Sequence, residues 1–119
     1  IMKAASIKII KNELKYQTQE ELIVLCLQLA RFKKENKELL TYLLYESENE
    51  TVFITDLKEE ISADFKLINT SSYFYIKKSV RKILKNIKKH IRYSKKKETE
   101  IELLIHFCTE LKNLNPSIE

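Results

Sequence analysis

Three side chains able to bind metals or move protons recur at every fourth residue near the carboxyl end of the chain: Glu102, His106 and Glu110. On a helix this spacing places all three on one face, where an imidazole between two carboxylates could coordinate a metal or act as a general base. A di-iron site in a helical bundle needs Glu-x-x-His on two helices and further Glu residues, and the sequence has neither. We therefore interpret the row as a surface histidine with helical neighbours, and predict no metal, no cofactor and no catalytic residue.

Other catalytic motifs are missing for a simple reason. The chain has no glycine, which excludes the P-loop, the dinucleotide fingerprint, the nucleophile elbow and the kinase glycine-rich loop as normally built. Cys26 and Cys108 lie within apolar helical patterns and are expected to be small buried thiols, which fits a reducing cytoplasm. The sequence therefore predicts a cytoplasmic protein that is not an enzyme.

Charge is distributed very unevenly along the sequence. Residues 77–97 contain eleven Lys and Arg residues and no Asp or Glu, whereas the rest of the chain carries 11 basic and 17 acidic residues, a net charge of −6. The overall charge of +5 therefore comes from this segment. On a helical wheel of residues 73–93, the cations form one arc beside an apolar arc. We call this arc the basic stripe: Lys77, Lys78, Arg81, Lys82, Lys85, Lys88, Lys89 and Arg92.

Like charges four residues apart weaken a helix, so the stripe is either a solvated, partly ion-paired face or a surface whose repulsion a negative partner offsets. The partner is either internal, through the acidic residues of segments 56–64 and 98–102, or external, through an acidic protein or nucleic acid. Only Arg81 and Arg92 in the stripe could make bidentate contacts to bases, so sequence-independent backbone binding is the nucleic-acid alternative. Membrane docking is not expected, since the apolar side of the same helix lacks Trp and is better explained as core.

The whole chain predicts an all-α fold. Without glycine, turns that need positive φ must use Asn, Ser or Lys, and β-hairpins are disfavoured. Apolar spacing predicts about six helices, near residues 2–15, 19–34, 37–47, 52–68, 73–93 and 98–113. We expect three antiparallel αα-hairpins in a helical bundle or short alpha-alpha superhelix, forming a single domain over residues 1–119.

Several local expectations accompany this fold. Thr18 and Glu21 match a capping box, and Asn36 is the expected N-cap of the third helix. The helix over residues 19–34 is so apolar that we expect it to be buried on more than one side, with a homodimer as an open alternative. Five aromatic residues are expected to close the end of the helical stack: Tyr42, Tyr45, Tyr73, Phe74 and Tyr75. No apolar run is long enough to span a bilayer.

The first third of the chain has a pattern that is similar to that of known helical proteins. Thr18-x-Glu20-Glu21-Leu22-Ile23, followed by Lys34-Glu35-Asn36-Lys37-Glu38-Leu39-Leu40, resembles small bacterial all-helical proteins and the helix pairs of HEAT-like, alpha-solenoid-like proteins. The resemblance implies a scaffold or interaction role without catalytic activity, and no functional residue carries over. Our hypothesis is a bacterial interaction protein that uses the basic helix to meet an acidic protein partner. The alternative is sequence-independent nucleic-acid binding through the same stripe.

Overall fold

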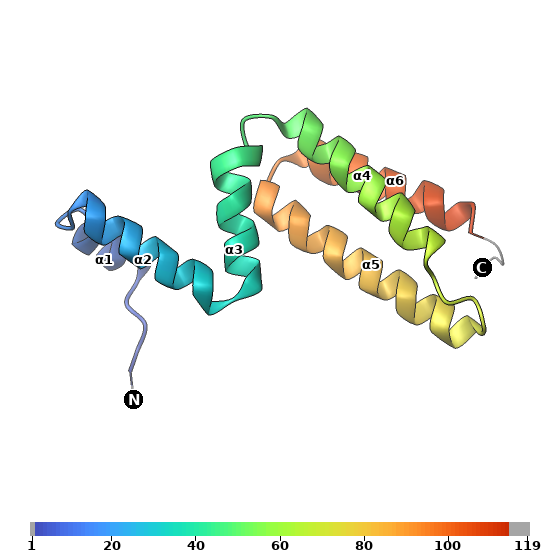
Figure 1. The fold of residues 1–119 in the computed structure, drawn as a ribbon, viewed down its shortest axis with the longest axis horizontal. Helices are drawn as coiled ribbons and strands as arrows, with labels where there is room; N and C mark the ends of the chain where they lie inside the picture. Colours follow the sequence, from blue (N-terminus) through green and yellow to red (C-terminus); the bar gives the residue numbers. More distant parts are fainter. Residues whose placement is uncertain (1, 115–119) are drawn as a thin grey trace. The chain divides into compact units, whose positions relative to one another are not determined.

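The computed structural model describes residues 2–114, which form six α-helices and one short π-helix without any strand (Figure 1). The predicted all-α fold is therefore confirmed. Backbone contacts divide the chain into two compact units, Ile1–Leu40 and Thr41–Glu119. The single domain expected from the sequence stays a prediction.

The first unit holds α1 (Ile7–Leu14), α2 (Gln19–Phe32) and most of α3 (Lys34–Thr41). The predicted capping box at the start of α2 is confirmed. The Thr18 hydroxyl accepts a hydrogen bond from the Glu21 amide at 3.1 Å, and the Glu21 carboxylate accepts one from the Thr18 amide at 2.9 Å. The backbone amide of Thr18, and after it the Thr18 side chain, hold the pKa of the Glu21 carboxyl below its usual value. Together the two hydrogen bonds satisfy two amides that helix geometry would leave without partners.

The expected burial of α2 on several sides is wrong. Ala30 is its one buried residue, while Ile23, Val24 and Leu29 are 51%, 56% and 64% exposed. The physical reason lies within the first unit, where α1 has only eight residues and is too short to cover a fourteen-residue helix on more than one side. The apolar surface of α2 is thus largely open.

The expected N-cap role of Asn36 is also wrong. Helix α3 begins at Lys34, so Asn36 lies within its first turn, where its side-chain amide donates to the Leu29 carbonyl at 2.8 Å. The last carbonyls of a helix lack intrahelical partners. Asn36 therefore caps the end of α2 rather than the beginning of α3.

The second unit is a three-helix bundle closed at one end by a π-helical turn. It comprises η1 (Tyr42–Glu46), α4 (Glu50–Lys66), α5 (Tyr73–Ser94) and α6 (Lys97–Lys112). Helix α5 runs antiparallel to α4 and α6, and each of the three packs against the other two (Figure 1). The last three predicted helices agree with these bounds to within two residues, whereas the one expected over 37–47 is divided between α3 and η1.

The core of the bundle follows the three- and four-residue spacing of its apolar side chains. Leu103 is fully buried, and the rings of Phe65 and Phe107 lie 5.7 Å apart between α4 and α6. Removing these side chains from water is the main stabilising contribution to such a bundle. The other buried apolar residues of the three helices are Phe53, Leu57, Ile61, Ile76, Val80, Ile83, Ile87 and Tyr93.

The turn between α5 and α6 contains a position with positive φ, and the chain has no glycine to occupy it. Lys95, the C-cap of α5, adopts the left-handed conformation with φ of 61°, and its amide donates to the Ile91 carbonyl at 2.8 Å. This conformation costs a non-glycine residue about 1 kcal/mol. The expectation that Lys, Asn or Ser would serve in such a turn is confirmed.

The expected burial of the two cysteines is wrong. Cys26 in α2 and Cys108 in α6 are both free and exposed, because each lies on a side of its helix that no other described part of its own unit covers. Within residues 2–114, no helix combines the length and hydrophobicity needed to cross a membrane.

Candidate functional site

The basic stripe lies on the outer side of α5. The buried residues Ile76, Val80 and Ile83 of this helix face the bundle, so the cations of the adjoining arc point to solvent. Lys89 is half-buried and takes part in an interaction within the chain. The other seven residues of the stripe are exposed: Lys77, Lys78, Arg81, Lys82, Lys85, Lys88 and Arg92.

Internal carboxylates do not neutralise the exposed part of the stripe. At the start of α6, Glu100 pairs with Lys97 at 3.7 Å and Glu102 pairs with Lys58 at 3.6 Å. On α4, the predicted acidic face is exposed or half-buried, and its members form no ion pair within residues 2–114: Asp56, Glu59, Glu60 and Asp64. The seven exposed stripe cations likewise have no carboxylate within 4.0 Å in that range.

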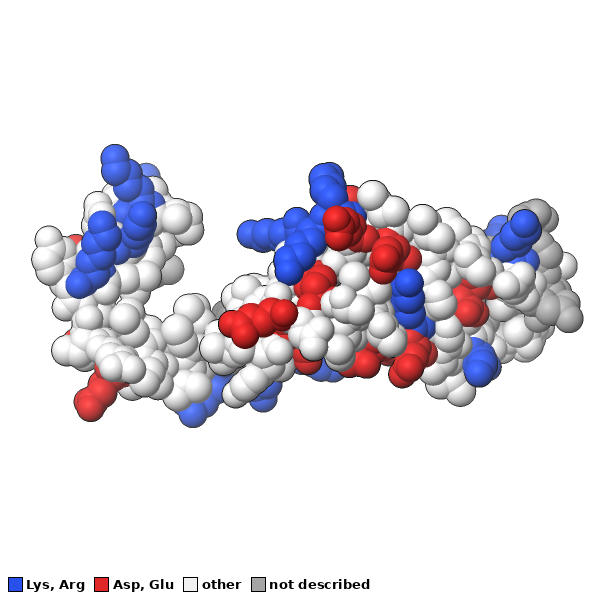
Figure 2. Space-filling view, turned by 90° about the horizontal axis from the view of Figure 1, so that it is seen from above, with Lys and Arg blue, Asp and Glu red and all other residues white. Residues whose placement is uncertain are grey.

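The view from the side of α4 and α6 shows a different surface. In Figure 2, acidic and basic side chains are interspersed over the bundle. Mixed charges of this kind give a solvated surface with small net fields, whereas a single-sign stripe attracts polyanions. The exposed surface of α5 is thus the electrostatically distinct part of the second unit.

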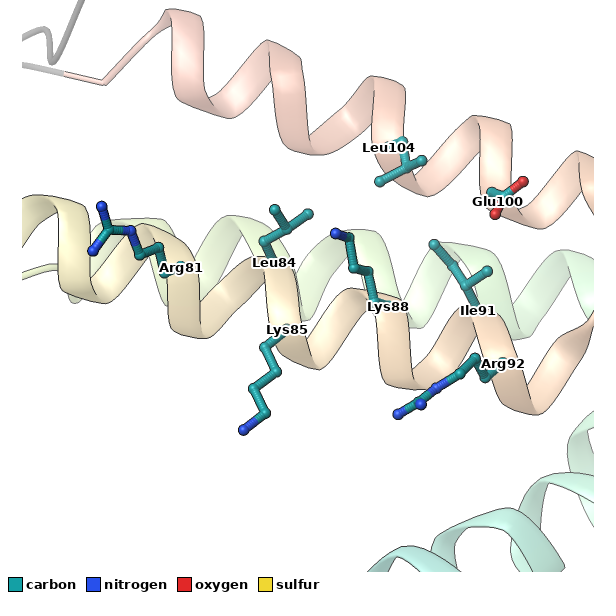
Figure 3. A pocket seen from close by; sticks show the side chains of 8 residues that line it. All are labelled: Arg81, Leu84, Lys85, Lys88, Ile91, Arg92, Glu100 and Leu104. Atoms are coloured by element: carbon teal, nitrogen blue, oxygen red, sulfur yellow. The ribbon is translucent and has the colours of Figure 1, made fainter.

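A shallow groove of about 570 Å³ runs between α5 and α6 beside the stripe. Leu84, Ile91 and Leu104 supply its apolar lining, and all three are half-buried. Figure 3 shows Leu84, Lys88 and Ile91 pointing toward α6, while Lys85 and Arg92 extend from the other side of α5. The polar and charged residues of the lining are Arg81, Lys85, Lys88, Arg92 and Glu100.

On its α6 side the groove is lined by Leu104 and by Glu100, whose carboxylate pairs with Lys97. A second hollow of about 330 Å³ adjoins the groove at Leu104 and is also lined by Ile105 and Cys108. Ile101 and Ile105 on α6 are 55% and 61% exposed. The two helices therefore offer cations on one side and open aliphatic side chains on the other.

The row of Glu102, His106 and Glu110 does not assemble as one site. Glu102 pairs with Lys58, whereas Ser62 of α4 lies 2.8 Å from His106 Nε2 and donates to Glu110 at 2.9 Å. Within residues 2–114, no group of three His, Cys, Asp or Glu side chains is placed to hold a metal ion. The sequence-based interpretation did not include Ser62, because its partners lie 44 and 48 residues away.

The geometry of this Ser–His–Glu cluster is unsuited to nucleophilic catalysis. In a catalytic triad the serine donates to one imidazole nitrogen, and the other nitrogen donates to the carboxylate. Here the Ser62 hydroxyl and the Glu110 carboxylate both lie beside Nε2 of His106, at 2.8 Å and 3.8 Å. Since the single Ser62 proton goes to Glu110, Nε2 donates to Ser62 and does not activate it. The cluster links α4 to α6.

A buried polar network at the closed end of the bundle was missed by the sequence analysis. Glu50, at the start of α4, accepts from the Tyr42 hydroxyl at 2.8 Å and from the hydroxyls of Ser94 and Thr99. Lys96 lies 3.6 Å from the same carboxylate and also donates to a backbone carbonyl of the turn that follows η1. Ser94 and Thr99 are 44 and 49 residues from Glu50 along the chain, and no local pattern marks them as its donors.

This network keeps Glu50 ionised. Burial alone would raise the pKa of Glu50, but the hydroxyls of Ser94, Thr99 and Tyr42, together with Lys96, outweigh it and lower the pKa. The pKa of Tyr42 shifts in the opposite direction, because burial raises the pKa of its phenol. A carboxylate that is ionised at neutral pH and fully hydrogen-bonded is a poor proton-transfer group there. We therefore infer that the network has a structural role, which is to hold η1, α4, α5 and α6 together.

The remaining aromatic side chains have separate roles. His90 donates through Nδ1 to the Asn86 carbonyl at 2.8 Å and packs with its ring centroid 5.5 Å from that of Tyr93. The expectation that the aromatic residues close the end of the stack holds for Tyr42, which is buried, and is wrong for Tyr73 and Phe74, which are 60% and 68% exposed. Phe74 makes an edge contact with its neighbour Tyr75 instead, at 5.3 Å between centroids.

Comparison of the chain with protein-family models, with curated proteins and with solved structures finds no match. The resemblance to bacterial helical and HEAT-like proteins therefore stays a prediction. What the molecule does has to be inferred from the surface of the bundle itself.

Proposed function

We propose that this protein is a bacterial, cytoplasmic interaction or scaffold protein without catalytic activity, which binds an acidic protein partner through the surface of α5. The observation that supports this proposal is the state of the basic stripe. Seven of its cations are exposed and have no carboxylate partner within residues 2–114, while nearby carboxylates pair with Lys58, Lys96 and Lys97.

The stripe carries an energetic cost that an acidic partner would relieve. Five pairs of stripe cations lie four residues apart on α5, and each such pair weakens a helix by about 0.2–0.5 kcal/mol, or about 1–2.5 kcal/mol in total. Carboxylates of a bound protein would offset this repulsion and would also steer association from a distance. The five pairs are Lys77–Arg81, Lys78–Lys82, Arg81–Lys85, Lys85–Lys89 and Lys88–Arg92.

Sequence-independent nucleic-acid binding is the second candidate, and it rests on the length of the stripe. From Lys77 to Arg92 the helix rises about 22 Å, enough to follow several phosphates of a backbone and release their counterions. The stripe contains two Arg and six Lys residues. Lysine acts as a point charge, so this composition favours backbone contact over the reading of bases.

The two candidates differ in the polyanion that the stripe prefers. Fluorescence anisotropy with a labelled poly-glutamate peptide, a short DNA duplex and a single strand, at about 50 and about 200 mM salt, compares them directly. The test variant carries Lys85→Glu, Lys88→Glu and Arg92→Glu. These three reversals change the net charge by −6, from +5 to −1.

The matched control carries Lys3→Glu, Lys8→Glu and Lys11→Glu, which change the net charge equally on exposed residues outside the bundle. We expect the wild-type protein to bind poly-glutamate, the stripe variant to lose this binding, and the control, which has the same net charge as the stripe variant, to keep it. Equal loss in both variants would show that only overall charge matters and would refute the assignment to α5. Tighter, steeply salt-dependent binding of either nucleic acid would favour the second candidate.

The homodimer alternative concerns a different surface. The open apolar residues of α2, such as Leu29 and Phe32 at 64% and 76% exposed, support a contact between two copies. Light scattering at several concentrations measures this association directly, and Leu29→Gln should abolish it.

A further inference from the structure

The walls of the groove between α5 and α6 differ in chemistry. On the α5 side, Arg81 and Lys88 border the groove, and Lys85 and Arg92 follow on the outer surface of the same helix. The floor is formed by aliphatic side chains, and the α6 side continues into the open Ile105. The carboxylate of the lining, Glu100, is paired with Lys97. A ligand that fills the groove must be apolar along one edge and anionic along the next.

An amphipathic α-helix has this combination of surfaces. Leu84 and Ile91 are seven residues apart, about 10.5 Å along α5, which equals two turns of a facing helix. Apolar residues at i, i+3 or i+4 and i+7 of such a helix can pack on Leu84, Ile91 and Leu104 as a fourth helix packs on a three-helix bundle. Carboxylates on its adjoining face would then meet the cations of α5.

We infer that the groove between α5 and α6 binds an acidic amphipathic helix of a partner protein, with its aliphatic residues on Leu84, Ile91 and Leu104 and its carboxylates toward Arg81 and Lys88. This inference rests on the proposed function and specifies the form of the acidic partner. The two adjoining hollows, of about 570 and 330 Å³, give the contact an apolar centre beside a charged border. That arrangement is typical of protein interfaces.

The same observations disfavour other occupants. A phosphate backbone could use the cations but would leave the apolar floor and Ile105 without a partner. A second copy could offer α2, yet α2 carries acidic residues only in its first turn, at Glu20 and Glu21. It would therefore leave most of the α5 cations unmatched. A second copy could also offer the acidic face of α4, but the apolar residues Phe53, Leu57 and Ile61 of that helix are buried in its own bundle and could not fill the apolar floor.

Two labelled peptides of equal composition test the inference. Both have about 18 residues of Leu, Ala and Glu, long enough for a helix to form on binding. One places Leu on a single helical face with Glu beside it, and the other has the same residues shuffled so that no face forms. Anisotropy at about 200 mM salt measures their affinities for the full chain.

Groove variants identify where the amphipathic peptide binds. Leu104→Gln removes the floor residue that both hollows share, and Ile105→Gln changes a side chain that is already exposed, so the fold should tolerate it. Val52→Gln is the matched control on α4, since Val52 is 45% exposed and lines neither hollow. Far-UV circular dichroism establishes that each variant is folded.

We expect the wild-type chain to prefer the amphipathic peptide by at least about fivefold, since burying even one leucine is worth that much. Both groove variants should lose the preference, and Val52→Gln should keep it. Equal affinity for the two peptides, or groove variants that behave like Val52→Gln, would overturn the inference while leaving charge-based binding of poly-glutamate intact. Failure of both peptides and of poly-glutamate would overturn the proposed function as well.

Discussion

The carboxylate of Glu50 provides the sharpest test of how the bundle is held together. Replacing it by glutamine keeps the size of the side chain but removes the charge and one of two acceptor oxygens. In the wild-type protein, one oxygen accepts from Tyr42 and the other from Ser94 and Thr99. These three hydroxyl donors belong to residues that are at most 8% exposed, so water is a poor substitute for the lost oxygen.

The size of the effect follows from this geometry. If the amide oxygen of the introduced glutamine faces Ser94 and Thr99, the Tyr42 hydroxyl meets an amide donor and cannot donate to it. One unsatisfied buried donor costs about 1–3 kcal/mol, and the two remaining bonds lose the strength that a charged acceptor gives them. We therefore expect Glu50→Gln to lower the free energy of unfolding by about 2–3 kcal/mol, and Glu50→Ala by more.

The pH dependence of this loss has a definite sign. The pKa of Glu50 is lower in the folded protein than in the unfolded chain. The unfolded chain therefore binds more protons in the acidic range, and stability falls as the pH falls. The contribution of Glu50 is fully present above the unfolded carboxyl pKa of about 4.3 and is lost as the pH drops through the folded value. Glu50→Gln should lack this part of the acid destabilisation.

Urea unfolding followed by far-UV circular dichroism at pH 7 and at about pH 3.5 measures both effects. The control is Glu59→Gln, which removes an exposed carboxylate from the same helix. A control within about 0.5 kcal/mol of wild type is expected. If Glu50→Gln were as stable as Glu59→Gln at pH 7, or lost as much stability as wild type on acidification, the structural reasoning about the network would be refuted.

Three further predictions concern helix ends. Thr18→Ala should return the pKa of Glu21 toward its ordinary value, because the Thr18 bonds that lower it depend on the capping box; NMR titration of the Glu21 carboxyl measures this. Lys95→Gly should stabilise the bundle by about 0.5–1 kcal/mol in thermal unfolding, because glycine adopts positive φ without strain, whereas Lys95→Ala should not. Asn36→Asp should cost about 0.5–1.5 kcal/mol by removing the donor to the Leu29 carbonyl, and hydrogen exchange that is unchanged over residues 29–41 would contradict it.

The local features of the fold were accessible from the sequence because they depend on neighbours in the chain. The capping box at Thr18 needs only a residue three positions away, and the helical spacing of α5 places Ile76 to Ile87 toward the core. The absence of glycine indicated that Asn, Ser or Lys would take a left-handed turn, and Lys95 does so. Each of these predictions uses physics that acts within a few residues.

Features that depend on distant partners could not be predicted in this way. The prediction that α2 is buried on more than one side failed because hydrophobic composition does not reveal how much covering surface α1 supplies. Glu50 could not be recognised because Ser94 and Thr99 reach it only once η1, α4, α5 and α6 have assembled. At the candidate site, the sequence predicted the stripe, whereas the groove beside it exists only where α6 lies along α5.

The two exposed thiols give this protein a built-in pair of reporters. Cys26 belongs to the unit of residues 1–40 and Cys108 to the unit that follows, and the sequence holds no further cysteine. Spin labels or fluorophores attached to both would read the separation of the two units in solution without any substitution. Cys108 also lines the hollow on α6, so a dye attached there alone would sense a helix entering the groove.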